Sequence, residues 1–157
     1  MVFTPNHQFF GLEPVADIRV TYAPLRGIDI PQSLVANAID EFPAIFIAAV
    51  CAQGNTVLRG AKELRIKESD RIAAMKNGFD QLGVKTIEYD DGLLIFGDQV
   101  FQGGRVDSMG DHRVAMAFAV AGHVAKNDIS IDHCDFIKTS FPNFLELANL
   151  VGMKICL

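Results

Sequence analysis

The sequence predicts an α/β domain built from repeated helix–strand units. Half of the 157 residues are hydrophobic and 21% are charged, so the chain has enough apolar side chain for one folded core. Apolar helical stretches alternate with short strand-like stretches, and the order helix, strand, helix, strand occurs twice. This pattern predicts two copies of one supersecondary unit within a single domain.

The first half of the chain opens with short strands within residues 15–30, where polar and apolar residues alternate. A helix is predicted over about 43–53, because Pro43 suits a first helical turn and Gly54 suits a helix end. Its residues are apolar on nearly every side, so we expect both of its faces to be covered. Residues 55–60 then predict a strand.

A polar connection over residues 61–68 leads to a helix predicted over about 70–82. Ser69 is a good N-cap for this helix, and Gly83 is a good residue to follow its end. Strand-like residues flank the turn sequence Asp90-Asp91-Gly92, a pattern typical of a β-hairpin.

The second half begins a helix at Asp111 that runs through about Ala125, followed by a strand at residues 128–132. A last helix is predicted with Ser140 as its cap and Pro142 near its first turn, ending at Gly152. The final residues, 153–157, predict a strand. The two repeat units would span about 33–97 and 105–157, with strands of a preceding unit at 13–30.

Equivalent charged residues recur at a constant interval in the two units. Asp40 and Asp111 lie 71 residues apart, and so do Lys67 and Lys138. Because each unit places an acid before an apolar helix and a lysine before the next helix, we expect all four at one end of the domain. Helix N-termini there would offer unpaired N–H groups to an anion. The alternative is that these residues are ordinary helix caps and solvated charges.

Five charged residues occur within the seven-residue stretch 65–71. Lys67 and Arg71 lie four residues apart at a helix entrance and could converge on one carboxylate or phosphate. Glu68 could serve as an acid, a base or a counter-charge to Arg71. Asp40 is either a general base or an acid favoured by the helix dipole.

Charge and cysteine content exclude several classes of protein. A net charge of −5 and a pI near 5.2 argue against a general nucleic-acid binder. Cys51, Cys134 and Cys156 fit a reducing cytoplasm and core positions rather than a disulfide or metal site. The chain has no signal-peptide pattern and no apolar run of the roughly 20 residues that span a membrane. We therefore expect a cytoplasmic protein without membrane or nucleic-acid partners.

Four motifs, in this order and spacing, resemble those of the EPSP synthase (3-phosphoshikimate 1-carboxyvinyltransferase) family. They are IDEFPA (39–44), RIKESDR (65–71), GDHRVAMAF (110–118) and IKTSFPNF (137–144). The resemblance implies a fold of two similar lobes made of repeated units. It also implies transfer of the enolpyruvyl group of phosphoenolpyruvate to the 5-hydroxyl of shikimate 3-phosphate, in chorismate and aromatic amino acid biosynthesis, with no metal or organic cofactor.

The same resemblance implies a role for each matching residue. Asp40 would accept the proton of the shikimate hydroxyl, and Lys67 would contact the shikimate substrate. Glu68 and Lys138 are both candidates for proton transfer at the methylene carbon. The cations that would bind phosphoenolpyruvate are Arg71, Arg113 and Lys138. Asp111 and His112 would support these groups.

The resemblance covers only about the last third of such an enzyme, without its amino-terminal lobe. We therefore expect this chain to belong with that lobe, in a longer or fused polypeptide, and to have negligible turnover alone. Two alternatives stay open: the related transferase that acts on UDP-N-acetylglucosamine, and a non-catalytic anion-binding module. The motifs RIKESDR and GDHR favour shikimate 3-phosphate, and the module would need no general base.

Overall fold

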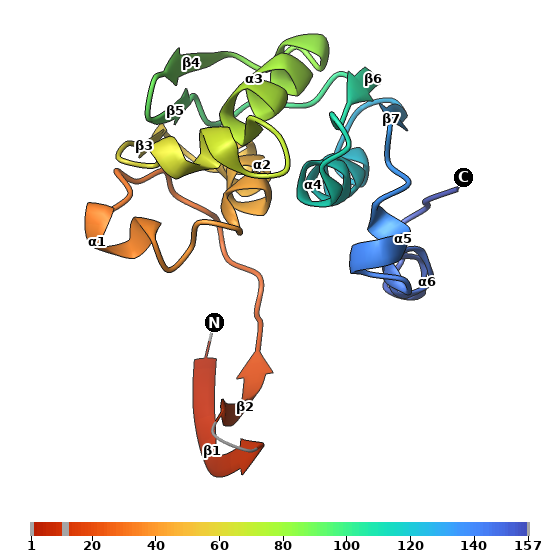
Figure 1. Ribbon diagram of the computed structural model, residues 1–157. Coiled ribbons are helices and arrows are strands. Elements are labelled where there is room, and N and C mark those ends of the chain that lie inside the picture. The colour runs from red at the N-terminus through yellow and green to blue at the C-terminus, as the bar shows by residue number, and fades with distance from the viewer. Residues whose placement is uncertain (1, 11–12, 157) are drawn as a thin grey trace.

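The computed structural model describes residues 2–10 and 13–156 (Figure 1). Strands β1 (Val2–Phe10) and β2 (Glu13–Arg19) pair as an antiparallel hairpin, which Figure 1 shows apart from the rest of the chain at the end of an extended segment. The strands expected within 15–30 are therefore present only up to Arg19. Residues 20–30 instead form two isolated parallel bridges, Arg26 with Gln53 and Asp29 with Val57.

The next part of the chain alternates helices with a small antiparallel sheet. Its elements are α1 (Gln32–Val35), α2 (Phe42–Cys51), β3 (Thr56–Leu58), the 3₁₀ helix η1 (Lys62–Ile66), α3 (Arg71–Gln81), β4 (Thr86–Tyr89) and β5 (Gly92–Ile95). The strand order in the sheet is β3-β5-β4, and β4 and β5 form the hairpin predicted at Asp90-Asp91-Gly92. Gly83 follows α3 with a φ of +74°, as its predicted position past the helix end requires.

The last part of the chain is a parallel strand pair joined by a helix, followed by two short helices. Its elements are β6 (Gly104–Asp107), α4 (His112–Gly122), β7 (Ile129–Asp132), α5 (Ile137–Ser140) and α6 (Phe144–Leu150). Strands β6 and β7 pair in parallel across the α4 crossover. The order helix, strand, helix thus recurs as α2–β3–α3 and α4–β7–α6, which places the fold in the predicted α/β class. The exact bounds of the two repeat units stay a prediction.

Two predicted helix caps are wrong. The carboxylate of Asp70, not Ser69, caps α3 by accepting the N–H of Ala73 at 2.9 Å. Ser140 is the last residue of the short helix α5 instead of capping α6. The interruption follows from Pro142, because a proline disfavours the helical conformation of the residue before it. Phe141 accordingly has φ −144° and ψ 77°.

Two further expectations are corrected by the packing. Residues 153–156 form no strand, because the amide side chain of Asn149 both donates to and accepts from the backbone of Ile155, each at 2.9 Å. Helix α2 is not covered on both faces: its larger side chains pack on α4 and β5, while a stripe through Ala44 and Cys51 is exposed. Cys156 is exposed as well, so neither cysteine is a core residue.

Helices α2, α3 and α4 share one apolar core. The rings of Phe79 on α3 and Phe118 on α4 are fully buried and meet edge to face, with centroids 5.8 Å apart and planes at 79°. Phe42 and Phe46 of α2 are fully buried in the same core. This packing fixes the N-termini of the three helices relative to one another. Among the described residues, no helix is long and apolar enough to cross a membrane.

Gly78 on α3 allows Phe118 of α4 to approach closely. A Cβ added at Gly78 would lie 2.2 Å from the Cζ atom of Phe118. In an open helix position Gly→Ala stabilises by about 0.5–1 kcal/mol. Here we expect Gly78→Ala to destabilise the chain by about 1–3 kcal/mol, since a fully buried ring must shift.

Urea unfolding of the purified chain measures this effect. Gly122→Ala in α4 is the matched control, because the nearest atom to its added Cβ is 4.0 Å away. We expect the control variant to be as stable as the wild type or slightly more stable. Equal midpoints for Gly78→Ala and the wild type would contradict the close packing of α3 on α4.

Candidate active site

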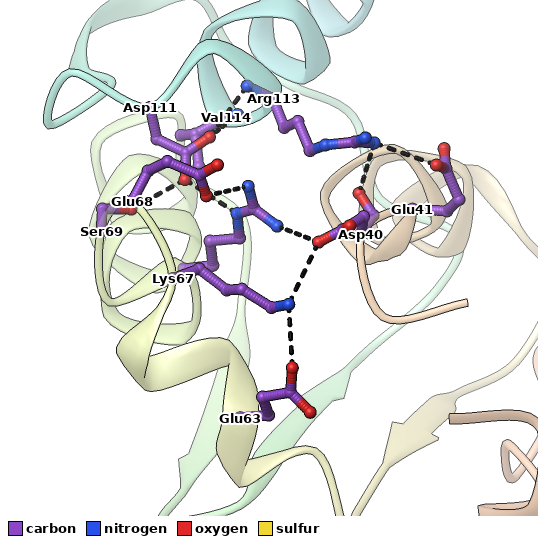
Figure 2. A network of polar contacts seen from close by, with 10 residues as sticks. Asp40, Glu41, Glu63, Lys67, Glu68, Ser69, Asp111, Arg113 and Val114 are labelled. Atoms are coloured by element: carbon purple, nitrogen blue, oxygen red, sulfur yellow. Dashed lines mark hydrogen bonds and ion pairs between the residues drawn. The ribbon is translucent and has the colours of Figure 1, made fainter. Parts of the chain in front are cut away.

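Arg71, the first residue of α3, connects a network of charged side chains. Figure 2 shows this network and labels its carboxylates Asp40, Glu68 and Asp111. The side chain of Arg71 is only 1% exposed and binds these three carboxylates. Nε donates to Asp111 at 2.8 Å, Nη1 donates to Asp40 at 2.8 Å, and Nη2 donates to Glu68 at 2.5 Å. Burial by itself would lower the pKa of Arg71, but the hydrogen bonds and charges of these carboxylates raise it. Arg71 is therefore a fixed positive charge.

Asp111 joins this arginine to helix α4. Its carboxylate is fully buried and caps α4, since Oδ1 accepts the backbone N–H groups of Arg113 at 2.8 Å and Val114 at 3.3 Å. The other oxygen, Oδ2, accepts from Arg71 and from the hydroxyl of Ser69 at 3.2 Å. Four donors thus satisfy one buried carboxylate, which is what makes its burial tolerable. This contact also explains why Ser69 does not cap α3.

Asp40 is half-buried just before α2 and faces several cations. Besides Arg71, it has the ammonium of Lys67 at 3.5 Å. The hydrogen bond from Arg71 lowers the pKa of Asp40 below its ordinary value, and although burial opposes this, the charges of Lys67 and Arg113 add to the lowering. The carboxylate is consequently ionised at neutral pH, so the form that can accept a proton is present.

Two cations lie nearer the solvent than Arg71 does. Lys67 is 21% exposed and its ammonium is 2.9 Å from a carboxylate oxygen of Glu63, whose hydrogen bond raises the pKa of Lys67. Arg113 is 32% exposed, and its Nη1 donates to the backbone carbonyl of Asp40 and to Oε1 of Glu41, both at 2.9 Å. Figure 2 shows these contacts arranged around Asp40.

The network contains six of the eight residues that the sequence predicts for the site: Asp40, Lys67, Glu68, Arg71, Asp111 and Arg113. His112 is half-buried at the start of α4 and makes no side-chain hydrogen bond to the described residues. Lys138 is exposed on α5 and has no ionic partner within the described part of the chain. It lines a groove between α4, β7 and residues 152–156, a groove that none of the six network residues lines.

The expectation that Lys138 shares one cluster with Asp40, Lys67 and Asp111 is therefore not supported by the contacts of this chain. The equivalent lysine in the first unit sits at the end of a 3₁₀ helix that leads straight into α3. Lys138 instead belongs to a single helical turn that Pro142 separates from α6. The same spacing along the sequence thus leads to two different local structures.

Three acceptors and donors were not among the predicted site residues: Glu41, Glu63 and Ser69. Glu63 lies four residues before Lys67, a spacing that favours an ion pair on a helix, so its role could have been read from the sequence. The contacts of Glu41 with α4 and of Ser69 with Asp111 join residues 72 and 42 positions apart. No local pattern predicts such pairs.

Three helix starts of an α/β fold thus meet at a network in which Arg71, Lys67 and Arg113 alternate with carboxylates. Fixed cations beside an ionised acid, Asp40, are an arrangement suited to an enzyme that acts on anionic substrates. The chain belongs to the EPSP synthase family: the pattern that defines EPSP synthase (3-phosphoshikimate 1-carboxyvinyltransferase) matches residues 9–147. This confirms the family expected from the four motifs.

The similar proteins agree on this family. The 3-phosphoshikimate 1-carboxyvinyltransferase of Legionella pneumophila (strain Paris) is 57% identical over 150 residues, which are 96% of this chain and 34% of the relative. That of Acidithiobacillus ferrooxidans (strain ATCC 53993 / BNL-5-31) is 59% identical over 145 residues, covering 92% of this chain and 33% of the relative.

A solved structure of EPSP synthase from Acinetobacter baumannii superposes on this chain with a TM-score of 0.92 at 45% sequence identity. The match covers 97% of this chain and 36% of the solved one. The chain therefore spans about a third of the length of the curated relatives and solved structures that it matches.

Proposed function

We propose that this chain supplies part of the active site of an enzyme that transfers the enolpyruvyl group of phosphoenolpyruvate to the 5-hydroxyl of shikimate 3-phosphate. The observation that carries the proposal is the environment of Asp40. Its carboxylate lies 2.8 Å from Arg71 and 3.5 Å from Lys67, and Arg113 binds its backbone carbonyl. An acid able to take a proton thus stands among the cations that two anionic substrates require.

The proposed reaction has two steps. In the addition, the shikimate hydroxyl oxygen bonds to C2 of phosphoenolpyruvate, Asp40 takes the hydroxyl proton, and C3 gains a proton from Glu68 or Lys138. In the elimination, C3 returns a proton to Glu68 or Lys138, whichever donated it, the electron pair of that C–H bond re-forms the double bond between C2 and C3, the bond from C2 to the phosphate oxygen breaks, and phosphate leaves. The chemistry needs fixed positive charge near the carboxylate and phosphate of phosphoenolpyruvate, for which Arg71 and Arg113 are proposed.

The lowered pKa of Asp40 bears on the first step. As arranged here, Asp40 shares the positive charge of Arg71 and Lys67, which makes it a weak proton acceptor. Anionic substrates would compete for the same cations. When Arg71 and Lys67 pair with the substrates, less positive charge acts on Asp40 and its pKa rises. Substrate binding would thus itself activate the base.

We propose that the partner of this chain is the rest of the enzyme, which corresponds to the remaining two-thirds of the length of the relatives. The side chains of Lys67 and Arg113 are partly exposed, and the opposing wall of a substrate cleft would come from the amino-terminal lobe. The proposed role of Lys138 depends on an arrangement that forms only with that lobe. A cytoplasmic location stays a prediction.

A test uses the completed protein, defined as a polypeptide in which this chain replaces the matching third of the Legionella pneumophila relative. Phosphate release is measured with phosphoenolpyruvate and shikimate 3-phosphate. Because loss of positioning groups costs about 10²-fold or more in rate, we expect the completed protein to exceed the 157-residue chain by at least that factor. UDP-N-acetylglucosamine in place of shikimate 3-phosphate should give no release.

Three outcomes would contradict the proposal. Equal turnover of the isolated chain would show that the other lobe is not needed. Phosphate release with phosphoenolpyruvate and UDP-N-acetylglucosamine, but not with phosphoenolpyruvate and shikimate 3-phosphate, would favour the related transferase that acts on UDP-N-acetylglucosamine. A folded completed protein that binds phosphoenolpyruvate without turnover would favour a non-catalytic anion-binding module.

A further inference from the structure

Glu41 occupies the N-cap position of α2 but makes no capping hydrogen bond. Its carboxylate contacts helix α4 instead, accepting from Nη1 of Arg113 at 2.9 Å (Figure 2). The Glu41 side chain is 64% exposed, so the carboxylate stays open to the solvent. The carboxylate of Glu41 thus forms an ion pair with Arg113, the arginine proposed to bind substrate.

Arg113 is anchored without Glu41. The backbone N–H of Arg113 donates to the buried carboxylate of Asp111 at 2.8 Å, and Nη1 also donates to the backbone carbonyl of Asp40 at 2.9 Å. Within the described part of the chain, the Nε and Nη2 groups of Arg113 have no hydrogen-bond partner. An anion that bridges Nη1 and Nη2 would therefore compete with Glu41 but leave the other anchors of Arg113 intact.

We propose that Glu41 is a displaceable counter-ion, which occupies Arg113 until an anionic substrate replaces it and thereby sets the affinity of the site for phosphoenolpyruvate. The inference rests on the proposed function, since it takes phosphoenolpyruvate as the ligand of Arg113. A singly charged anion would merely exchange one carboxylate for another at this arginine. Phosphoenolpyruvate carries both a carboxylate and a phosphate, so it gains contacts with neighbouring cations that compensate for the displacement.

Removing the charge of Glu41 should therefore tighten binding. The coupling energies measured for exposed ion pairs correspond to about 1.4- to 5-fold in an equilibrium constant. Glu41 also repels the arriving anion, and this repulsion is lost in the same substitution. We expect Glu41→Gln to lower the Kd for phosphoenolpyruvate about two- to five-fold, since glutamine keeps the acceptor oxygen but not the charge.

The measurement is a calorimetric titration of the completed protein with phosphoenolpyruvate alone, because both substrates together would turn over. The KM for phosphoenolpyruvate is measured separately, from phosphate release with shikimate 3-phosphate present. Glu41→Ala should act in the same direction as Glu41→Gln. The matched control is Glu88→Gln, because Glu88 forms a similar pair with Arg65 at 2.8 Å outside the network and should not change the Kd. The gain in Glu41→Gln should shrink as the salt concentration rises.

Arg113→Ala separates the two proposals. If Arg113→Ala weakens binding and Glu41→Gln does not tighten it, the counter-ion role of Glu41 is wrong while the proposed function stands. Weaker binding in Glu41→Ala would likewise overturn the inference, because it would show that Glu41 positions Arg113. If Arg113→Ala leaves the Kd unchanged, the assignment of Arg113 in the proposed function fails and the inference fails with it. In the Arg113→Ala background, Glu41→Gln should lose most of its effect.

Discussion

Arg71→Ala is expected to lower the free energy of unfolding by about 3–5 kcal/mol, the usual cost of breaking a buried ion pair from one side. The substitution leaves Asp111 fully buried without its cation, and it also removes the contact between Asp40 and α3. Single domains have stabilities of about 5–15 kcal/mol, so this loss is a large share of the total. Urea unfolding of the 157-residue chain, followed by circular dichroism, measures it.

Two further variants identify the cause. Arg105→Ala removes an arginine that is 75% exposed and pairs with Asp132, and we expect little measurable change in stability from it. Asp111→Asn in the Arg71→Ala background should restore part of the lost stability, because a buried amide costs less than a buried unpaired carboxylate. An unfolding midpoint of Arg71→Ala close to that of the wild type would contradict the buried network.

Asp40→Asn is expected to reduce the kcat of the completed protein by about 10²–10⁴-fold, the usual contribution of a positioned general base. Asparagine keeps the oxygen that accepts from Arg71 but cannot take up a proton. The affinity for phosphoenolpyruvate should change only a few-fold, because the arginines proposed to bind it remain. Phosphate release and calorimetric titration together distinguish the loss of a base from the loss of binding.

Glu88→Gln serves as the control for removing a carboxylate outside the network, and it should leave kcat unchanged. If Asp40→Asn turns over at the rate of the wild type, another group accepts the hydroxyl proton. If it instead loses affinity for phosphoenolpyruvate to the same extent as activity, Asp40 acts by holding the cations in place.

Local signals were sufficient for several elements of the fold. Pro43 marks the start of α2, Gly83 follows the C-cap of α3, and Asp90-Asp91-Gly92 marks the β4–β5 hairpin. Each of these depends on the backbone preferences of one or two residues. Strand β6 had no such signal, because its four residues become a strand by pairing in parallel with β7, 25 residues further along the chain.

In the candidate site too, local sequence indicates some features, while others depend on contacts between distant parts of the chain. The motifs identified Asp40, Arg71 and Asp111 as candidates, yet these residues lie 31 and 40 positions apart, and only the packing of α2, α3 and α4 brings them into contact. Ser69 is the predicted cap of α3, but Asp70 fills that position because the hydroxyl of Ser69 donates to Asp111, a residue 42 positions away in the sequence. The position of Lys138 depends on the break at Pro142, which a repeat interval does not encode.

The meeting of three helix starts at one guanidinium has a consequence for how this protein can change over time. Arg71 and Asp111 hold the core helices together and also carry or orient the proposed site, so substitutions there would be rejected even under selection for folding alone. Glu41 and Glu63 are mostly exposed and each contacts a single cation. Substitutions at Glu41 and Glu63 can therefore change the affinity for substrate during evolution, while Arg71 and Asp111 stay unchanged.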